Sequence, residues 1–137
     1  MFWPMSLIFK ALKVMPVDRS DAGDVGDKVA GEFIKRDKFI PVIFPEGTRT
    51  ETGKMKPFKA GAKMVADKFA LKVQPVVLIA TAWHFSNKRK DFRPGTVTAV
   101  YLDSFVADKN DPDWLNNLHN TMQKVYDDEL ANHPRYR

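Results

Sequence analysis

Two short polar segments contain the residues with the clearest potential for chemistry, Asp18-Arg19 and Pro45-Glu46-Gly47-Thr48-Arg49. Each follows an apolar run, Met15 to Val17 and Phe39 to Phe44, that is short enough to be a strand. In an α/β sheet, ligands bind in the loops beyond the carboxyl ends of strands. An arginine in each of two such loops can hold one phosphate from two sides, because the planar guanidinium matches phosphate oxygens. The two segments together predict a phosphate site.

The residues around the second arginine have roles that suit an anion. Gly47 lets the backbone approach the anion without a Cβ in the way. Thr48 can donate its hydroxyl, and Glu46 can hold an arginine or a lysine in place. A plainer interpretation stays open for each segment. Arg19 would then form a surface ion pair with a neighbouring aspartate, and Glu46 and Arg49 would pin an ordinary turn.

Composition narrows the classes of ligand. Lysine and arginine exceed aspartate and glutamate by 22 − 17 = 5, so the surface field favours anions. The basic residues do not form one long tract and lack interleaved aromatic residues, so nucleic acid is not an expected partner. The chain has no cysteine, and its three histidines, His84, His119 and His133, match no compact zinc spacing. No metal is expected.

Helical periodicity alternates with short apolar runs along the 137 residues. The expected helices are Met1 to Met15, Asp24 to Arg36, one marked by Ala60 and Phe69, and one that begins at Asp111-Pro112 with Trp114, Leu118, Met122 and Val125 on its core face. The expected strands, besides the two named above, are Val73 to Ala80, buried on both faces, and Gly95 to Phe105. The order predicts one domain over residues 1–137, an α/β fold with a mixed, largely parallel sheet flanked by helices.

The first segment, Met1 to Met15, is too short and too often charged to span a bilayer. Lys10 and Lys13 share a narrow polar stripe on a helix whose other side is apolar. Two interpretations compete for this helix. Its apolar face packs on the domain core, or it enters a bilayer interface with the lysines near anionic headgroups.

The second of the two segments, which we call the phosphate loop, also resembles a block of a known protein family. Phe44-Pro45-Glu46-Gly47-Thr48-Arg49-Thr50 is similar to the FPEGTRS block of the 1-acylglycerol-3-phosphate acyltransferases, with threonine in place of the last serine. Pro16-Val17-Asp18-Arg19-Ser20 resembles the block before it. Lys56-Pro57-Phe58-Lys59-Ala60-Gly61-Ala62 and Val73-Gln74-Pro75-Val76-Val77 resemble two later blocks, in the expected order.

The resemblance implies acyl transfer from acyl-CoA or acyl carrier protein, as co-substrate, to the free hydroxyl of lysophosphatidic acid, which forms phosphatidic acid. It implies that Arg19, Glu46, Gly47, Thr48 and Arg49 bind the acceptor phosphate. Lys56 and Lys59 would be lesser contributors or solvated surface, and solvated surface is the preferred interpretation. No cofactor is implied beyond the acyl donor. The expected location is a membrane surface, on its cytoplasmic face.

The family's general base is a histidine with an aspartate five positions later, upstream of the arginine loop. No histidine precedes Arg19, and none of the three histidines has an aspartate at that spacing. His84 is expected to be a partly exposed loop residue, and His119 and His133 to be structural or solvated. The chain is therefore expected to be truncated at its N-terminus relative to the family and to retain phosphate binding without the catalytic pair. The alternative is a non-catalytic module that binds anionic lipid at a membrane surface.

Overall fold

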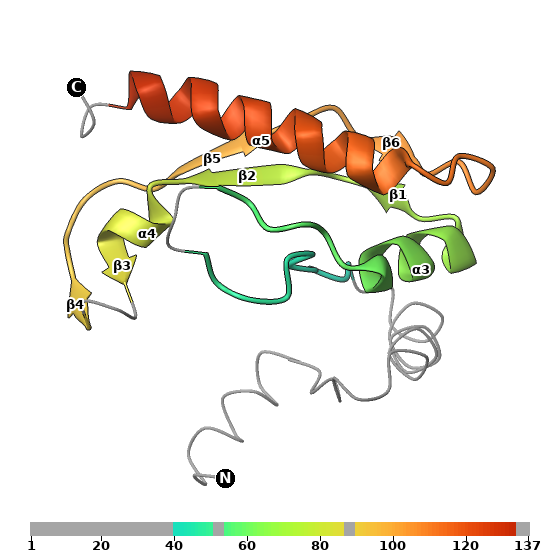
Figure 1. The fold of residues 1–137 in the computed structure, drawn as a ribbon, viewed down its shortest axis with the longest axis horizontal. Coiled ribbons are helices and arrows are strands. Elements are labelled where there is room, and N and C mark those ends of the chain that lie inside the picture. The colour runs from blue at the N-terminus through green and yellow to red at the C-terminus, as the bar shows by residue number, and fades with distance from the viewer. Residues whose placement is uncertain (1–39, 51–53, 87–89, 134–137) are drawn as a thin grey trace, which may run out of the picture. The chain divides into compact units, whose positions relative to one another are not determined.

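The computed structural model describes residues 40–50, 54–86 and 90–133 of the chain (Figure 1). Its elements, in chain order, are α3 (Ala60–Phe69), β1 (Lys72–Val73), β2 (Val76–Ile79), α4 (Thr81–His84), β3 (Phe85–Ser86), β4 (Asp91–Phe92), β5 (Thr98–Tyr101), β6 (Phe105–Val106) and α5 (Trp114–Asn132). The chain divides into two compact units, Met1–Val42 and Ile43–Arg137, and all of these elements belong to the second. The helices and the strand expected before Phe39 lie outside the described residues.

The strands form three antiparallel pairs, β1 with β6, β2 with β5, and β3 with β4. The combination of helices and strands agrees with the predicted α/β class. The prediction of a largely parallel sheet is not supported in the described part of the chain. A parallel pair needs a crossover, usually a helix, that returns the chain to the same end of the sheet. The residues described between β2 and β5 instead form α4 and the antiparallel β3–β4 pair, and β5 runs back along β2 in the opposite direction.

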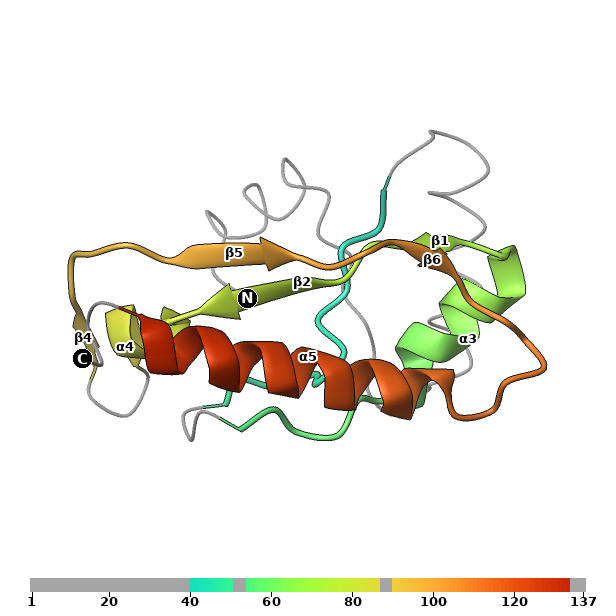
Figure 2. The same cartoon turned by 90° about the horizontal axis from the view of Figure 1, so that it is seen from above.

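Strand β2 is buried on one face only. Val77 and Ile79 are almost fully buried and pack with Met122 of α5, whereas Leu78 between them is 41% exposed. Figure 2 shows α5 running along this strand. The prediction that the strand is buried on both faces is therefore wrong. The apolar run Val73 to Ala80 resembles a strand from the middle of a parallel sheet, but its residues alternate between a covered and an open face.

The predicted strand over Val73 to Ala80 is also divided in two at Gln74 and Pro75. Proline has no N–H to donate, so the ladder of backbone hydrogen bonds is interrupted there. The side-chain amide of Gln74 donates to the carbonyl oxygen of Leu102 at 2.6 Å, and the N–H of Leu102 donates to the carbonyl oxygen of Pro75 at 3.2 Å. These bonds connect β1–β6 to β2–β5 across the interruption.

The strand predicted over Phe39 to Phe44 is not formed over residues 40–44. Ile40, Val42 and Phe44 are 88%, 80% and 74% exposed. An apolar run is stabilised as a strand mainly by the neighbours it packs against, and Pro41 cannot donate to a ladder. Within the described residues, β5 is the strand that pairs with β2.

The two helices that flank the sheet agree with the periodicity of the sequence. Helix α3 ends at Phe69 and is capped by Ala70, which has a left-handed backbone and donates its N–H to the carbonyl oxygen of Ala66. Helix α5 begins at Trp114, two residues after the predicted first position, because the Asp111 carboxylate accepts the N–H of Asp113 at 2.8 Å and forms a turn there. Among the described helices, none combines the length and the apolar character that crossing a bilayer requires.

The predicted core face of α5 is confirmed. Trp114 and Met122 are buried, and Leu118 and Val125 pack against the buried clusters. The indole N–H of Trp114 donates to the carboxylate of Asp67 at 3.1 Å, which joins the start of α5 to α3. The helix thus holds both the strands and α3 in place.

Candidate functional site

The phosphate loop begins with a tight turn at Phe44 to Gly47. The N–H of Gly47 donates to the carbonyl oxygen of Phe44 at 3.0 Å, which closes a four-residue turn. Pro45 stands at the second position, where its fixed φ is favourable, and Gly47 at the fourth, where glycine is common. Gly47 has φ of +66°, a left-handed conformation that costs an L-residue about 1–2 kcal/mol. The sequence therefore builds the turn locally.

Glu46 links the turn to the segment that precedes α3. Its carboxylate accepts the backbone N–H of Lys56 at 2.8 Å, so two segments ten residues apart are held together. The hypothesis that Glu46 holds a basic side chain is wrong in detail, because within the described residues its carboxylate contacts a backbone amide. The Glu46–Arg49 ion pair of the plainer interpretation does not form. Charge on Arg49 and Lys56 is consequently not neutralised by this carboxylate.

Lys56 and Lys59 both reach the turn. The ammonium nitrogen of Lys56 donates to the hydroxyl oxygen of Thr48 at 2.9 Å. The side chain of Lys59 passes beside Gly47: a Cβ placed on Gly47 would lie 3.0 Å from Cε and 3.2 Å from Nζ of this lysine. The Lys56 and Lys59 ammonium groups therefore lie against two consecutive residues of the loop, Thr48 and Gly47, whereas the preferred interpretation predicted solvated surface lysines.

The backbone around Lys59 joins the turn to helix α3. The N–H of Lys59 donates to the carbonyl oxygen of Pro45 at 2.9 Å, and Lys59 is the residue that precedes the first turn of α3. No acidic residue occupies that first turn, and no side chain caps it. The partial positive charge of the helix N-terminus therefore adds to that of the lysines. Figure 1 shows the loop, in teal and green, leading into α3.

Helix α5 contacts the segment that follows the turn, at Met55 and Phe58. The side-chain oxygen of Gln123 accepts the N–H of Met55 at 2.6 Å, and a ring nitrogen of His119 lies 3.3 Å from the carbonyl oxygen of Met55. The ring of Phe58 meets that of His119 edge to face, with centroids 4.9 Å apart. These contacts join residues more than 60 positions apart in the sequence. No local sequence pattern identified Gln123, because its role depends on the packing of α5.

Four of the five predicted site residues lie in the described part of the chain. Glu46, Gly47 and Thr48 share the network above, and Arg49 follows directly with an exposed side chain. Arg19 lies outside the described residues, so the closure of two arginines on one phosphate stays a prediction. The arrangement that is described combines an exposed hydroxyl, bare backbone at Gly47, two ammonium groups and one guanidinium. Such groups bind a phosphate and do not by themselves move a proton from a hydroxyl nucleophile.

His84 differs from the prediction of a partly exposed loop residue. It ends α4 and is only 5% exposed. Its Nδ1 lies 2.9 Å from the carbonyl oxygen of Arg93, and its Nε2 lies 2.9 Å from the carbonyl oxygen of Thr96. Both ring nitrogens are occupied by backbone groups of the β4–β5 segment, so the residue is structural and not a substitute base. His119 and His133 are structural as well, the first through Met55 and Phe58 and the second buried at the end of α5.

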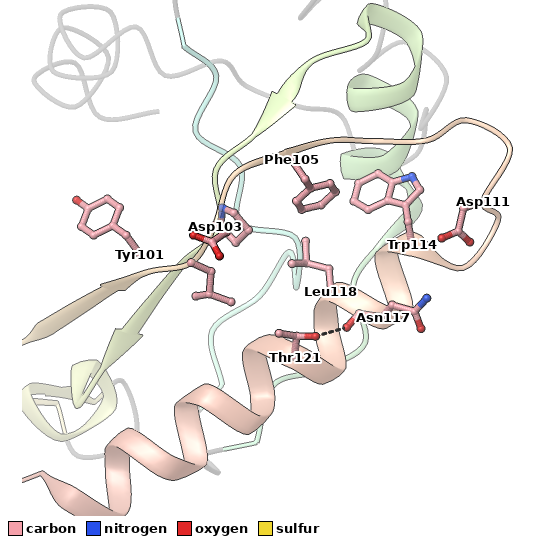
Figure 3. Close-up of a pocket in the computed structure, with 10 residues that line it drawn as sticks. Tyr101, Asp103, Phe105, Asp111, Trp114, Asn117, Leu118 and Thr121 are labelled. Atoms are coloured by element: carbon pink, nitrogen blue, oxygen red, sulfur yellow. Dashed lines mark hydrogen bonds between the residues drawn. The ribbon is translucent and has the colours of Figure 1, made fainter.

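A separate groove lies between the β5–β6 connection and the start of α5. It has a volume of about 560 Å3 and is open to solvent. Phe105, Trp114 and Leu118 form its apolar part, and the carboxylates of Asp103 and Asp111 stand at its edge (Figure 3). The lining residues include none from the phosphate loop. Two carboxylates repel an anion, so this groove does not suit the acceptor phosphate.

Comparison with known proteins identifies the same family that the sequence of the loop resembles. The acyltransferase family model matches residues 1–79. A 1-acyl-sn-glycerol-3-phosphate acyltransferase of Helicobacter pylori strain J99 is 40% identical over 112 residues, 80% of this chain and 47% of the relative. A protein of the same name from Cocos nucifera is 32% identical over 105 residues, 75% of this chain and 33% of the relative. The human beta form is 36% identical over 74 residues, 54% of this chain and 27% of the relative.

These alignments cover most of the chain but less than half of each relative. No solved structure shows a significant match. The family model extends over more than half of the 137 residues and includes both the turn, Phe44 to Gly47, and Arg49. Sequence motifs, loop geometry and relatives thus agree, and the chain belongs to the acyltransferase family.

Proposed function

We propose that this chain supplies the acceptor-phosphate site for acyl transfer to lysophosphatidic acid, the reaction that forms phosphatidic acid. One observation carries the proposal: Lys56 and Lys59 bring two ammonium groups to the Gly47–Thr48 turn that Arg49 follows. Charge-assisted hydrogen bonds to phosphate contribute about 1.5–3 kcal/mol each, and backbone without a Cβ permits close approach. The names of the relatives support the reaction, and the charge excess of five, from 22 − 17, supports an anionic acceptor.

The acyl donor in this proposal is a thioester, acyl-CoA or acyl carrier protein. The acceptor's free hydroxyl attacks the thioester carbonyl, the C–S bond breaks, and the thiol takes the proton that the hydroxyl loses. A positioned base accelerates such a proton transfer by about 10²–10⁴. His84, His119 and His133 do not fit that role, and no histidine precedes Arg19. We therefore propose that this chain by itself binds the acceptor and acylates it poorly.

Location at the cytoplasmic face of a membrane belongs to the same proposal. A lysophospholipid acceptor resides in a bilayer, and a net positive surface attracts anionic headgroups at about 1 kcal/mol per basic residue near the surface. The chain would then meet its acceptor with the Glu46 to Arg49 loop turned toward the headgroups.

The proposal is tested by calorimetric titration with an eight-carbon lysophosphatidic acid below its micellar concentration. The monoacylglycerol of the same chain length serves as the phosphate-free comparison. Arg49→Met should weaken binding of the phosphate by about tenfold, the loss of one charge-assisted bond. Lys72→Met removes an equal charge from β1 and should leave it unchanged. Equal affinity for the two ligands would show that the loop does not recognise phosphate.

A second measurement addresses turnover and the alternative of a general anionic-lipid module. Incubation with labelled acyl-CoA and lysophosphatidic acid should give product only slowly. Flotation with phosphatidylglycerol vesicles should be equal for Arg49→Met and Lys72→Met. If Arg49→Met abolished vesicle binding and lysophosphatidic acid binding to the same degree, the lipid-module alternative would be the better account. Full turnover would contradict the proposed lack of a base.

A further inference from the structure

The side chain of Lys59 is placed for a role beyond general surface charge. Within the described part of the chain, Lys59 is exposed and has no carboxylate partner, yet its ammonium lies beside the backbone of Gly47. The position that a Cβ of residue 47 would occupy is within 3.2 Å of its Nζ and closer still to its last two methylene carbons. Any phosphate that approaches the bare backbone of Gly47 must therefore meet this ammonium group.

The number of positive charges at the turn suits a particular class of phosphate. A phosphate monoester carries a charge of about −1.5 to −2 near pH 7, because its second pKa is near 6. A phosphate diester has lost that ionisable group and carries a single negative charge. A single guanidinium neutralises a diester, whereas a monoester needs a second cation. Lys59 supplies a second cation beside Gly47, two residues before Arg49 in the sequence.

Lys56 acts on the same site through Thr48. The Thr48 hydroxyl accepts a hydrogen bond from the Lys56 ammonium at 2.9 Å, so its own proton must point elsewhere. The carbonyl oxygen of Arg49 is 3.4 Å from the hydroxyl oxygen, beyond the usual 2.5–3.0 Å range of an O–H···O bond. The hydroxyl donates only this long, weak bond, which a phosphate oxygen at the usual distance can replace.

We propose that Lys59 is the residue that selects a phosphate monoester over a diester at this loop, and that Lys56 is a positioning residue that orients the Thr48 hydroxyl toward the phosphate. This inference rests on the proposed function, because it concerns the same acceptor. It assigns to the two lysines a selectivity that the turn residues alone do not provide. The ligand chemistry is a dianionic phosphate monoester, carried by a lysophospholipid or by a soluble phosphate.

The test of Lys59 compares two ligands that share an eight-carbon acyl chain, lysophosphatidic acid and lysophosphatidylglycerol. The first is a monoester and the second a diester. Lys59→Met should reduce affinity for the monoester by about tenfold and for the diester by less than about threefold, since a charge-assisted bond is lost mainly with the dianion. Lys59→Arg should keep the preference. Lys72→Met, with the same loss of charge on β1, should behave as the parent chain.

Glycerol 3-phosphate separates a lipid headgroup from a free phosphate. If Lys59 contacts the phosphate itself, Lys59→Met should weaken this soluble monoester by the same factor as the lipid. An unchanged monoester-to-diester ratio in Lys59→Met would overturn the inference. That failure is distinct from failure of the proposed function, in which the parent chain itself would bind monoacylglycerol as well as lysophosphatidic acid.

The test of Lys56 is a double-mutant cycle with Thr48. If Lys56 acts by orienting the hydroxyl, Lys56→Met and Thr48→Val each weaken the monoester, and the double variant is no weaker than Thr48→Val alone. Lys56→Arg, which can still donate to the hydroxyl, should recover part of the affinity. Urea unfolding checks that the variants are equally stable. Additive losses in the cycle would show that Lys56 contacts the phosphate independently or acts only as general charge.

Discussion

Replacement of Gly47 by alanine tests whether the loop depends on its left-handed turn. With φ of +66°, the backbone at this position costs an L-residue about 1–2 kcal/mol. The new methyl group would also lie 3.0 Å from Cε of Lys59, closer than real Cβ atoms normally come to another atom. That carbon belongs to a flexible side chain, so we expect Lys59 to move away and the steric cost to be small. The expected loss of stability is therefore about 1–2 kcal/mol, set by φ.

The displacement of Lys59 gives this variant a second, separate effect. Moving the ammonium away from the turn should weaken monoester binding by about tenfold, as in Lys59→Met, because the same charge-assisted bond is lost. In the combined variant Gly47→Ala with Lys59→Met, the binding losses should not add, whereas the cost in stability should persist. Binding and stability thus report two different consequences of one methyl group.

Gly61 provides the matched control in the same chain. A Cβ added there meets nothing within 4 Å, and the residue lies in the first turn of α3. Gly61→Ala should therefore stabilise the chain, by up to about 1 kcal/mol, because alanine loses less entropy than glycine in a helix. The free energies of unfolding of both variants are measured by urea denaturation. If Gly47→Ala were as stable as Gly61→Ala, the left-handed turn would not be what requires glycine.

Three further variants test the supports of the fold. Ala70→Gly should stabilise the chain by about 1 kcal/mol, because φ of +47° at the end of α3 favours glycine; a lower urea midpoint would contradict this. His84→Phe puts a larger ring without N–H groups in place of the imidazole, so the carbonyl oxygen that the imidazole N–H reaches, that of Arg93 or Thr96, loses its donor. We expect a loss of about 1–3 kcal/mol in urea unfolding, against almost none if solvent reaches that oxygen. Gln123→Leu removes the acceptor of the Met55 N–H and should cost about 1–2 kcal/mol, together with weaker phosphate binding in the same calorimetric assay.

Local patterns in the sequence identify the helices and the turn. The spacing of Ala60, Met64, Val65 and Phe69 predicts α3, and the apolar stripe from Trp114 to Val125 predicts the buried side of α5. Both patterns reflect contacts between residues three or four apart, which a helix sets by its own geometry. The phosphate loop is recognisable for a similar reason, since proline and glycine fix the turn within four residues.

Strand pairing depends on distant residues and is less predictable. The apolar run from Val73 to Ala80 gives no sign that β5 approaches it in the antiparallel direction or that Leu78 remains exposed. His84 is similar, because the two carbonyl oxygens beside its ring nitrogens belong to residues 9 and 12 positions further along the chain. A histidine between aromatic residues has the same local sequence whether it is in a loop or holds a hairpin. Only the contacts distinguish the two.

Contacts with helix α5 make the geometry of the phosphate loop depend on residues outside the loop's sequence motif. The family match ends at residue 79, but Met55 is held by Gln123 and His119 of α5. Those two side chains contact the N–H and the carbonyl oxygen of Met55, the neighbour of Lys56. The backbone N–H of Lys56 binds Glu46, and its ammonium group binds Thr48. A change in the packing of α5 therefore reaches the turn through two hydrogen-bonded steps. The motif supplies the chemical groups of the site, and the helix outside the matched region keeps them in place before any phosphate arrives, which lowers the ordering cost of binding.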